Sequence, residues 1–358
     1  MNDEIIRVFH PGYYLREYIE ELQMTQDEFA KRLGISGKQV SLILQEKASI
    51  TIDVANKLSK LLDSSIELWI NLQLNYDKYL LQLEEEKLIE EEKIIYKMID
   101  KKFLVDIGVI NKKENINEGI LKLRKASMVS SLTLHKNKDI YCFYRTSIMK
   151  EDSLENIVCK NVWVSIASSL AKQVETQKFN ENKILKNIEE FRKMTLENPN
   201  VFYPKLKRVL SECGVALVIL PALKNSNIGG AIKWIDKDKV MMALNTRGAY
   251  NDKFWFSFFH ELKHVLQQIK RKVLINSDFN MDYIYEYEAD IFAKETLIKS
   301  ELLNKLTVYD ENTIKEFANM NNIHPGIVVG RLQKEGIIKY SEYNYLKEKY
   351  DTFVLKCD

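Results

Sequence analysis

The run Phe258-Phe259-His260-Glu261-Leu262-Lys263-His264-Val265-Leu266 places two of the chain's five histidines four residues apart, with a carboxylate directly after the first. On a helix this spacing puts both imidazoles on one face, one turn apart, with Glu261 beside them. Large apolar residues continue around the run at three- and four-residue spacing, from Phe254 and Trp255 to Leu266. This pattern predicts a largely buried helix that carries a pair of metal ligands.

A catalytic zinc ion takes three protein ligands and keeps one position open for water, so His260 and His264 need a third donor. The run Tyr285-Glu286-Tyr287-Glu288-Ala289-Asp290 also has helical spacing and places Glu286 and Asp290 on one face. We expect Glu286 to complete a Zn²⁺ site, with Glu288 as the competing ligand, and Asp290 to accept a histidine N–H. Glu261 is the expected catalytic general base. The alternative is two core histidines and a solvated acidic turn.

Length and composition limit the classes of protein to which this chain can belong. With 358 residues the chain exceeds the usual size of one domain, so two or three units are expected. A net charge of +2 gives no general attraction to nucleic acid, so any DNA binding must be local. Four cysteines without a C-x-x-C pair, and no apolar amino-terminal stretch, predict a cytoplasmic protein away from the membrane.

Residues 24–47 carry the signals of two short helices. Thr25 with Glu28, and Ser36 with Gln39, form capping boxes, and Gly34 between them fits a left-handed helix end. The small and apolar residues at 30, 40 and 43 fall where a helix-turn-helix needs its crossing and core positions. We therefore predict a DNA-binding unit, although a five-helix bundle that does not touch DNA can carry the same pattern.

The second of these helices, residues 36–45, is expected to lie in the major groove. Its exposed side would present Ser36, Lys38, Gln39 and Ser41 to the bases. Gln26 and Lys47 are expected to reach phosphates.

Residues 64–103 are expected to continue as helix. An apolar stripe from Trp69 to Leu83 predicts a dimerisation or docking surface, or else the closing wall of the bundle's own core. The acidic clusters Glu84–Glu86 and Glu90–Glu92 predict a solvated helix face.

The segments His10–Leu15, 24–47 and Ser65–Tyr76 together resemble the HigA-type antitoxins of the Xre helix-turn-helix class. The resemblance covers residues 10 to about 80. It implies that this module binds operator DNA as a homodimer, represses its own operon and neutralises a small ribonuclease toxin.

The rest of the chain alternates helices with a few strands. Helices are expected at 118–126, 153–173, 182–197 and 203–213, and strands at 140–145 and 215–220. Residues 229–235 and 240–245 predict a β-hairpin that leads into the helix of His260, with 230–235 on the sheet edge. His135 and Cys142 are isolated, and packing or exposure is the favoured interpretation of each.

Four stretches resemble the ImmA/IrrE metallopeptidases that carry an amino-terminal Xre domain: 229–235, 254–264, 286–293 and 323–333. In that family the first glutamate of the E-x-x-A-[DN] motif, which the stretch 286–293 matches, binds zinc, and this favours Glu286 over Glu288. Members of the family cleave helix-turn-helix repressors. Lys263 departs from the Gly or Ala usual there, and a lysine near zinc would lower the nucleophilicity of its water. His324 and Arg331 match the family's tail and either stabilise an oxyanion or brace the last helices, which we favour.

These patterns predict an α+β, predominantly helical protein: an all-α helix-turn-helix bundle followed by a zincin-like metallopeptidase domain with a small β-sheet. The expected divisions are 1–80 for the DNA-binding domain, 81–103 for a helical linker, 104–200 for an intermediate region and 201–358 for the peptidase. The expected function is a transcriptional regulator whose zinc endopeptidase cleaves an Xre repressor or a partner protein. The alternative is a non-enzymatic autorepressor or antitoxin in which the metallopeptidase fold is structural or sensory.

Overall fold

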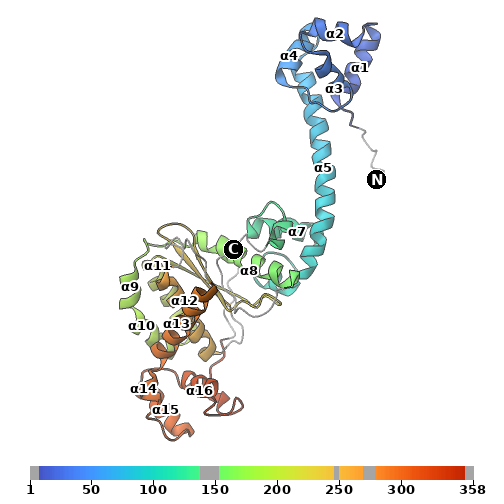
Figure 1. Cartoon of the computed structure of the whole chain (residues 1–358). Helices are drawn as coiled ribbons and strands as arrows, with labels where there is room; N and C mark the ends of the chain where they lie inside the picture. Colours follow the sequence, from blue (N-terminus) through green and yellow to red (C-terminus); the bar gives the residue numbers. More distant parts are fainter. Residues whose placement is uncertain (1–7, 138–152, 246–249, 269–278, 351–358) are drawn as a thin grey trace. The chain divides into compact units, whose positions relative to one another are not determined.

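The computed structural model describes residues 8–137, 153–245, 250–268 and 279–350, with side chains from 284 onward in the last range (Figure 1). The chain divides into two compact units, residues 1–90 and 91–358. It is predominantly helical, with one three-stranded sheet among the described residues, as the sequence predicts. The expected strand at 140–145, with Cys142, lies outside the described residues.

The first unit is a small bundle in which side chains cap most of the helices. Its helices are α1 Pro11–Glu21, α2 Gln26–Leu33, α3 Gly37–Leu44, α4 Ile52–Leu61 and the start of α5 Ile66–Met98. Thr25 Oγ1 accepts the N–H of Glu28, and Ser36 Oγ accepts the N–H of Gln39, so α2 and α3 begin where the sequence predicts. Gly34 ends α2 with a φ of 69°, a left-handed conformation that favours glycine.

The bundle's core contains the positions expected of a helix-turn-helix. Ala30, Val40 and Ile43 are all buried, and Trp69 of α5 is fully buried among them. The start of the apolar stripe on α5 therefore closes the bundle. Further along the same helix the pattern changes, because the side chains of Leu80, Leu81 and Leu83 are exposed.

The prediction of a solvated acidic face on α5 is wrong at Glu92. This side chain is fully buried and lies in the second unit. Its carboxylate accepts hydrogen bonds from Arg124 Nε at 2.9 Å, from Ser131 Oγ at 2.8 Å and from the N–H of Leu132. Burial of a carboxylate is tolerable here because a guanidinium and two neutral donors replace its water shell. The neighbouring Glu91 is exposed, as expected.

The second unit contains the sheet and the remaining helices. Before the sheet come α6 Lys101–Asp106, α7 Ile116–Ser127, η1 Leu132–Lys136, α8 Leu154–Gln173, α9 Glu181–Lys186, α10 Ile188–Lys193, η2 Met194–Leu196 and α11 Pro199–Glu212. After it come α12 Asn251–Gln267, α13 Phe279–Leu297, α14 Ser300–Leu303, α15 Glu311–Met320, α16 Pro325–Lys334 and η3 Asn344–Leu346. Residues 104–200, set apart in the sequence analysis, belong to this unit because α8 contacts β1 and β3.

The sheet has the strand order β1-β3-β2, with β1 Val215–Leu220, β2 Gly230–Trp234 and β3 Val240–Asn245. β2 and β3 form the predicted antiparallel hairpin, with Gly230 opposite Leu244. β1 pairs with β3 in parallel, which the sequence analysis did not anticipate. β2 is thus an edge strand among the described residues, and α12 packs against both β2 and β3.

Candidate metal centre and DNA-recognition helix

The candidate metal centre lies where α12 packs along α13. One face of α12 is anchored in the core by fully buried side chains: Trp255, Phe258, Phe259, Leu262 and Val265. This anchoring agrees with the apolar spacing in the sequence. It fixes the rotation of α12, so that His260 and His264 share the opposite, partly exposed face and meet α13.

Three donor side chains come together at this contact. His260 Nε2 lies 3.1 Å from His264 Nε2 and 3.3 Å from Oε2 of Glu286. The other carboxylate oxygen of Glu286, Oε1, lies 3.4 Å from His264 Nε2. One potential ligand atom of each residue lies within 4.8 Å of the other two. Two imidazole nitrogens and a carboxylate that converge in this way could hold a metal ion, and catalytic zinc sites use such a donor set.

The outer nitrogens of both imidazoles also have partners. Asp290 Oδ1 lies 2.9 Å from His260 Nδ1, where the sequence places a hydrogen-bond acceptor. Gln267 Oε1 lies 2.8 Å from His264 Nδ1, a contact that the sequence analysis missed although Gln267 follows His264 by one helical turn. Each acceptor takes the Nδ1–H of its imidazole, so that in the neutral ring the lone pair lies on the inner Nε2, where it can bind a metal.

The structure separates the two rival glutamates. Glu288 Oε2 accepts a hydrogen bond from Gln267 Nε2 at 3.2 Å and lies 3.6 Å from Lys263 Nζ. The donor cluster in the described residues contains Glu286 and not Glu288. Lys263 therefore directs its charge toward Glu288 and toward the ring of Phe292, 5.9 Å from its centroid.

The electrostatics of the cluster favour a cation. Burial acts to lower the pKa of His260, but the Asp290, Glu286 and Glu261 carboxylates outweigh it and raise that pKa to about 10. Burial acts to raise the pKa of Glu286, yet the two imidazoles hold it below its usual range. Without a metal, the site retains a proton because its carboxylates attract positive charge.

Glu261 lies on the side of α12 that faces the edge strand. A Cβ placed on Gly230 would be 2.5 Å from Glu261 Oε1, so the strand approaches the carboxylate as closely as glycine allows. Burial raises the pKa of Glu261, although the two histidines act in the opposite direction. A carboxylate with a raised pKa accepts a proton more readily, as a general base must.

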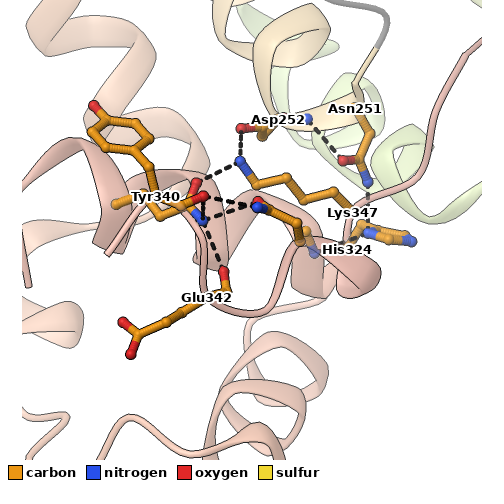
Figure 2. Close-up of polar contacts among 9 residues, drawn as sticks. Asn251, Asp252, His324, Tyr340, Glu342 and Lys347 are labelled. Atoms are coloured by element: carbon orange, nitrogen blue, oxygen red, sulfur yellow. Dashed lines mark hydrogen bonds and ion pairs between the residues drawn. The ribbon is translucent and has the colours of Figure 1, made fainter. Parts of the chain in front are cut away.

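His324 and Arg331 make bracing contacts, in line with the favoured interpretation. His324 Nδ1 caps α16 by accepting the N–H of Gly326 and lies 2.6 Å from Asn251 Nδ2 at the start of α12 (Figure 2). Arg331 Nη2 donates to Ser300 Oγ at 3.1 Å, and Arg331 Nε donates to Glu335. These bonds tie α16 to α14 and to the start of α12, the helix that carries His260 and His264.

In the first unit, the expected DNA-contacting residues lie on the surface of α2, α3 and the following turn. Gln26, Ser36, Lys38 and Lys47 are exposed, and Gln39 and Ser41 are partly buried. Ser41 Oγ accepts a hydrogen bond from Gln45 Nε2 at 3.1 Å, and Lys47 Nζ donates to Gln45 Oε1 at 3.2 Å. Gln45, which the sequence analysis did not single out, thus links two of the predicted contacts.

Known proteins match the amino-terminal part of the chain. Residues 15–69 match the helix-turn-helix family model. The uncharacterized HTH-type transcriptional regulator YddM of Escherichia coli is 38% identical over 63 residues, which cover 18% of this chain and 67% of that protein. Virulence-associated protein I of Dichelobacter nodosus is 33% identical over 69 residues, 19% of this chain and 64% of that protein. The chain thus spans about two thirds of the length of these relatives.

Solved structures of antitoxin proteins are also similar in sequence to part of the chain. An addiction module antidote protein of the HigA family from Coxiella burnetii is 38% identical, covering 24% of this chain and 96% of that one, with a TM-score of 0.23. Pseudomonas aeruginosa antitoxin HigA, solved with the higBA promoter, is 33% identical, covering 24% and 95%, with a TM-score of 0.23. In the described part of the chain, no helix has the length and apolar character that a membrane crossing requires.

Proposed function

We propose that this chain, which belongs through its amino-terminal domain to the helix-turn-helix family of transcriptional regulators, binds operator DNA and carries a zinc-dependent peptidase in its second unit. The observation that carries the peptidase is the convergence of His260, His264 and Glu286. The observation that carries DNA binding is the sequence match over residues 15–69, together with an exposed face on α3.

For DNA binding, α3 enters the major groove with its amino-terminal end toward the bases. Lys38 and Gln39 offer hydrogen-bond donors to base edges, and Lys47 offers its charge to a phosphate. Because the whole chain carries a net charge of only +2, specific binding depends on this geometry and on a second copy of the domain. We expect a homodimer on a two-part operator.

For the metal, the residues present fit a zinc ion. Two imidazoles and one carboxylate converge, their outer nitrogens have acceptors, and the surrounding carboxylates favour positive charge. His260, His264 and Glu286 would hold the ion, which when bound supplies Lewis acidity and a water of lowered pKa.

The chain's own residues account for the other requirements of peptide hydrolysis. Glu261 takes up a proton at its carboxylate and passes it to the leaving amine. The edge strand β2 pairs with an extended substrate through its free backbone groups and so holds the scissile bond beside Glu261. Asp290 and Gln267 keep both imidazoles in one tautomer and orientation. We propose an Xre repressor or a partner protein as the substrate.

The test is the variant Glu261→Gln, which keeps the shape of the side chain but cannot accept the proton. Zinc content measured by atomic emission should stay near one ion per chain, while cleavage of candidate repressor or toxin partners is lost. Glu286→Gln should lose the zinc, and the matched variant Glu288→Gln should keep it. Unchanged cleavage by Glu261→Gln would refute the mechanism.

A second candidate is a non-enzymatic autorepressor or antitoxin that binds a small ribonuclease toxin. The likeness to transcriptional regulators and HigA-family proteins favours it. This candidate predicts an operator footprint that a chelator leaves unchanged. It also predicts that His260→Ala loosens the fold and has no effect on the cleavage of any protein. If the footprint persists under chelation and zinc-dependent cleavage is also observed, the better account is the first proposal, in which one chain both binds operator DNA and cleaves a protein.

A further inference from the structure

A cavity of about 750 Å³ lies beside the candidate metal centre. Its wall includes Gly229 next to β2, Asn245 at the end of β3, and Phe256 and Ser257 on α12. The ring of Phe256 lies 6.2 Å from the imidazole of His260, centroid to centroid. The cavity therefore borders both the edge strand and the metal helix, and its volume lies in the range of ligand pockets, roughly 300–1,000 Å³.

The charge of the wall is strongly positive. Five basic side chains line it: Lys253, Lys294, Arg331, Lys334 and Lys347. Asp252 is the single acidic residue among the described residues of the wall, and it is ion-paired with Lys347, whose Nζ lies 2.7 Å from Asp252 Oδ2 (Figure 2). Arg331 is likewise ion-paired with Glu335, which lies outside the wall, so the excess positive charge comes from Lys253, Lys294 and Lys334 and favours an anionic ligand.

Arg331 offers a specific contact for that anion. Its side chain is only 10% exposed, and its Nε and Nη2 atoms are used by Glu335 and Ser300. Its Nη1 is buried without a hydrogen-bond partner in the described structure. A buried donor without an acceptor is unfavourable, and a guanidinium matches a carboxylate in both charge and geometry. Arg331 lines the cavity wall, so a ligand carboxylate that enters there would bring an acceptor to this guanidinium.

The rest of the cavity is suited to apolar groups and is held in shape. Phe256, Leu297 and Ile327 contribute apolar surface to the wall. Lys347 Nζ also donates to Gln333 Oε1 at 2.8 Å, and Gln333 Nε2 donates to the carbonyl of Glu342 at 2.9 Å. These bonds brace the segment after α16 against α12, so the cavity is formed before a ligand arrives.

We propose that this cavity binds an acidic side chain of the peptide substrate together with an adjacent apolar side chain, and thereby selects the sequence next to the cleaved bond. The acidic group meets Arg331 and Lys294, and the apolar group packs on Phe256 and Leu297. The proposal rests on the peptidase function for the identity of the ligand as substrate. Binding in the cavity itself needs neither zinc nor turnover.

The experiment uses the full chain carrying Glu261→Gln, so that no probe is consumed. Two fluorescein-labelled peptides with blocked ends differ only in a central Leu-Glu-Phe or Leu-Gln-Phe, and fluorescence anisotropy gives their Kd values with and without zinc. We expect the Glu peptide to bind roughly tenfold to a hundredfold more tightly, the range for a hydrogen bond to a charged group.

Three substitutions locate the contact. Arg331→Gln should remove most of the preference for the Glu peptide, and Lys294→Gln should reduce it about two- to fivefold. Lys299→Gln, an exposed lysine outside the cavity wall, should change nothing. Because Arg331 also braces α14, a circular dichroism melt checks its fold, and Lys294→Gln gives an independent result if that variant is loosened.

Equal binding of the two peptides, or a preference that survives both substitutions, would overturn the proposal. If the protein prefers the Glu peptide but binds no zinc, the proposed cavity ligand is supported and the proposed peptidase function is refuted. Zinc-dependent cleavage without any Glu preference would do the reverse.

Discussion

Glu92 offers a sharp test of how the second unit holds the end of α5. Its Oε2 accepts hydrogen bonds from Arg124 Nε at 2.9 Å and Nη2 at 2.5 Å, and its Oε1 accepts from Ser131 Oγ at 2.8 Å. Glu92→Gln keeps the acceptor for Ser131 but turns an NH₂ group toward the guanidinium. Two strong bonds are lost, and the guanidinium of Arg124 no longer faces a carboxylate at this position.

Removal of one member of a buried ion pair costs about 3–5 kcal/mol. We expect about 3 kcal/mol for Glu92→Gln, at the lower end, because one of its two acceptor oxygens remains. Urea unfolding followed by tryptophan fluorescence measures this, since Trp163, Trp234 and Trp255 all report on the second unit. Glu91→Gln, the same change at the exposed neighbour, should stay within about 0.5 kcal/mol of the unaltered protein. If Glu92→Gln behaves like Glu91→Gln, the buried pair does not form.

Three further outcomes follow from the described contacts. Asp290→Asn should weaken zinc binding roughly tenfold to a hundredfold, because His260 loses its anionic hydrogen-bond acceptor. Competition with a chelating dye measures the affinity. Gly230→Ala should lower cleavage roughly a hundredfold with zinc retained, because the new Cβ displaces Glu261. Burial lowers the pKa of His135 from 6.5 to about 4, so the unfolded state binds more protons between these values. Stability should therefore fall by up to about 3 kcal/mol as the pH drops through that window, and His135→Gln should flatten the titration of stability.

Local signals explain which features the sequence could predict. The ends of α2 and α3 depend on Thr25, Ser36 and Gly34, each of which acts on backbone groups within a few residues. The pairing of His260 with His264 depends on one helical turn. The contact of Asp290 with His260 could be predicted because both residues lie on helices of the same period. The face of one helix that carries the histidines can therefore pack against the face of the other that carries Asp290.

The features that the sequence could not predict depend on residues distant along the chain. Glu92 belongs to an acidic run that is typical of a solvated helix, and donors 32 to 40 residues later, on Arg124, Ser131 and Leu132, make its burial possible. The parallel pairing of β1 with β3 is likewise set by packing and not by any local pattern. The cavity wall combines residues from Gly229 to Lys347, so no window of sequence contains it.

The composition of the donor cluster bears on what a metal would do here. A structural zinc site is closed by four protein ligands, whereas a catalytic one has three and leaves a position for water. In the described residues the cluster contains three donors, and Glu261, although adjacent in sequence to His260, is not one of them. It lies instead against Gly230 of the edge strand, on the side from which an extended peptide would approach. A carboxylate in that place suits the general base of the proposed peptidase, whereas a purely structural metal would not require one there.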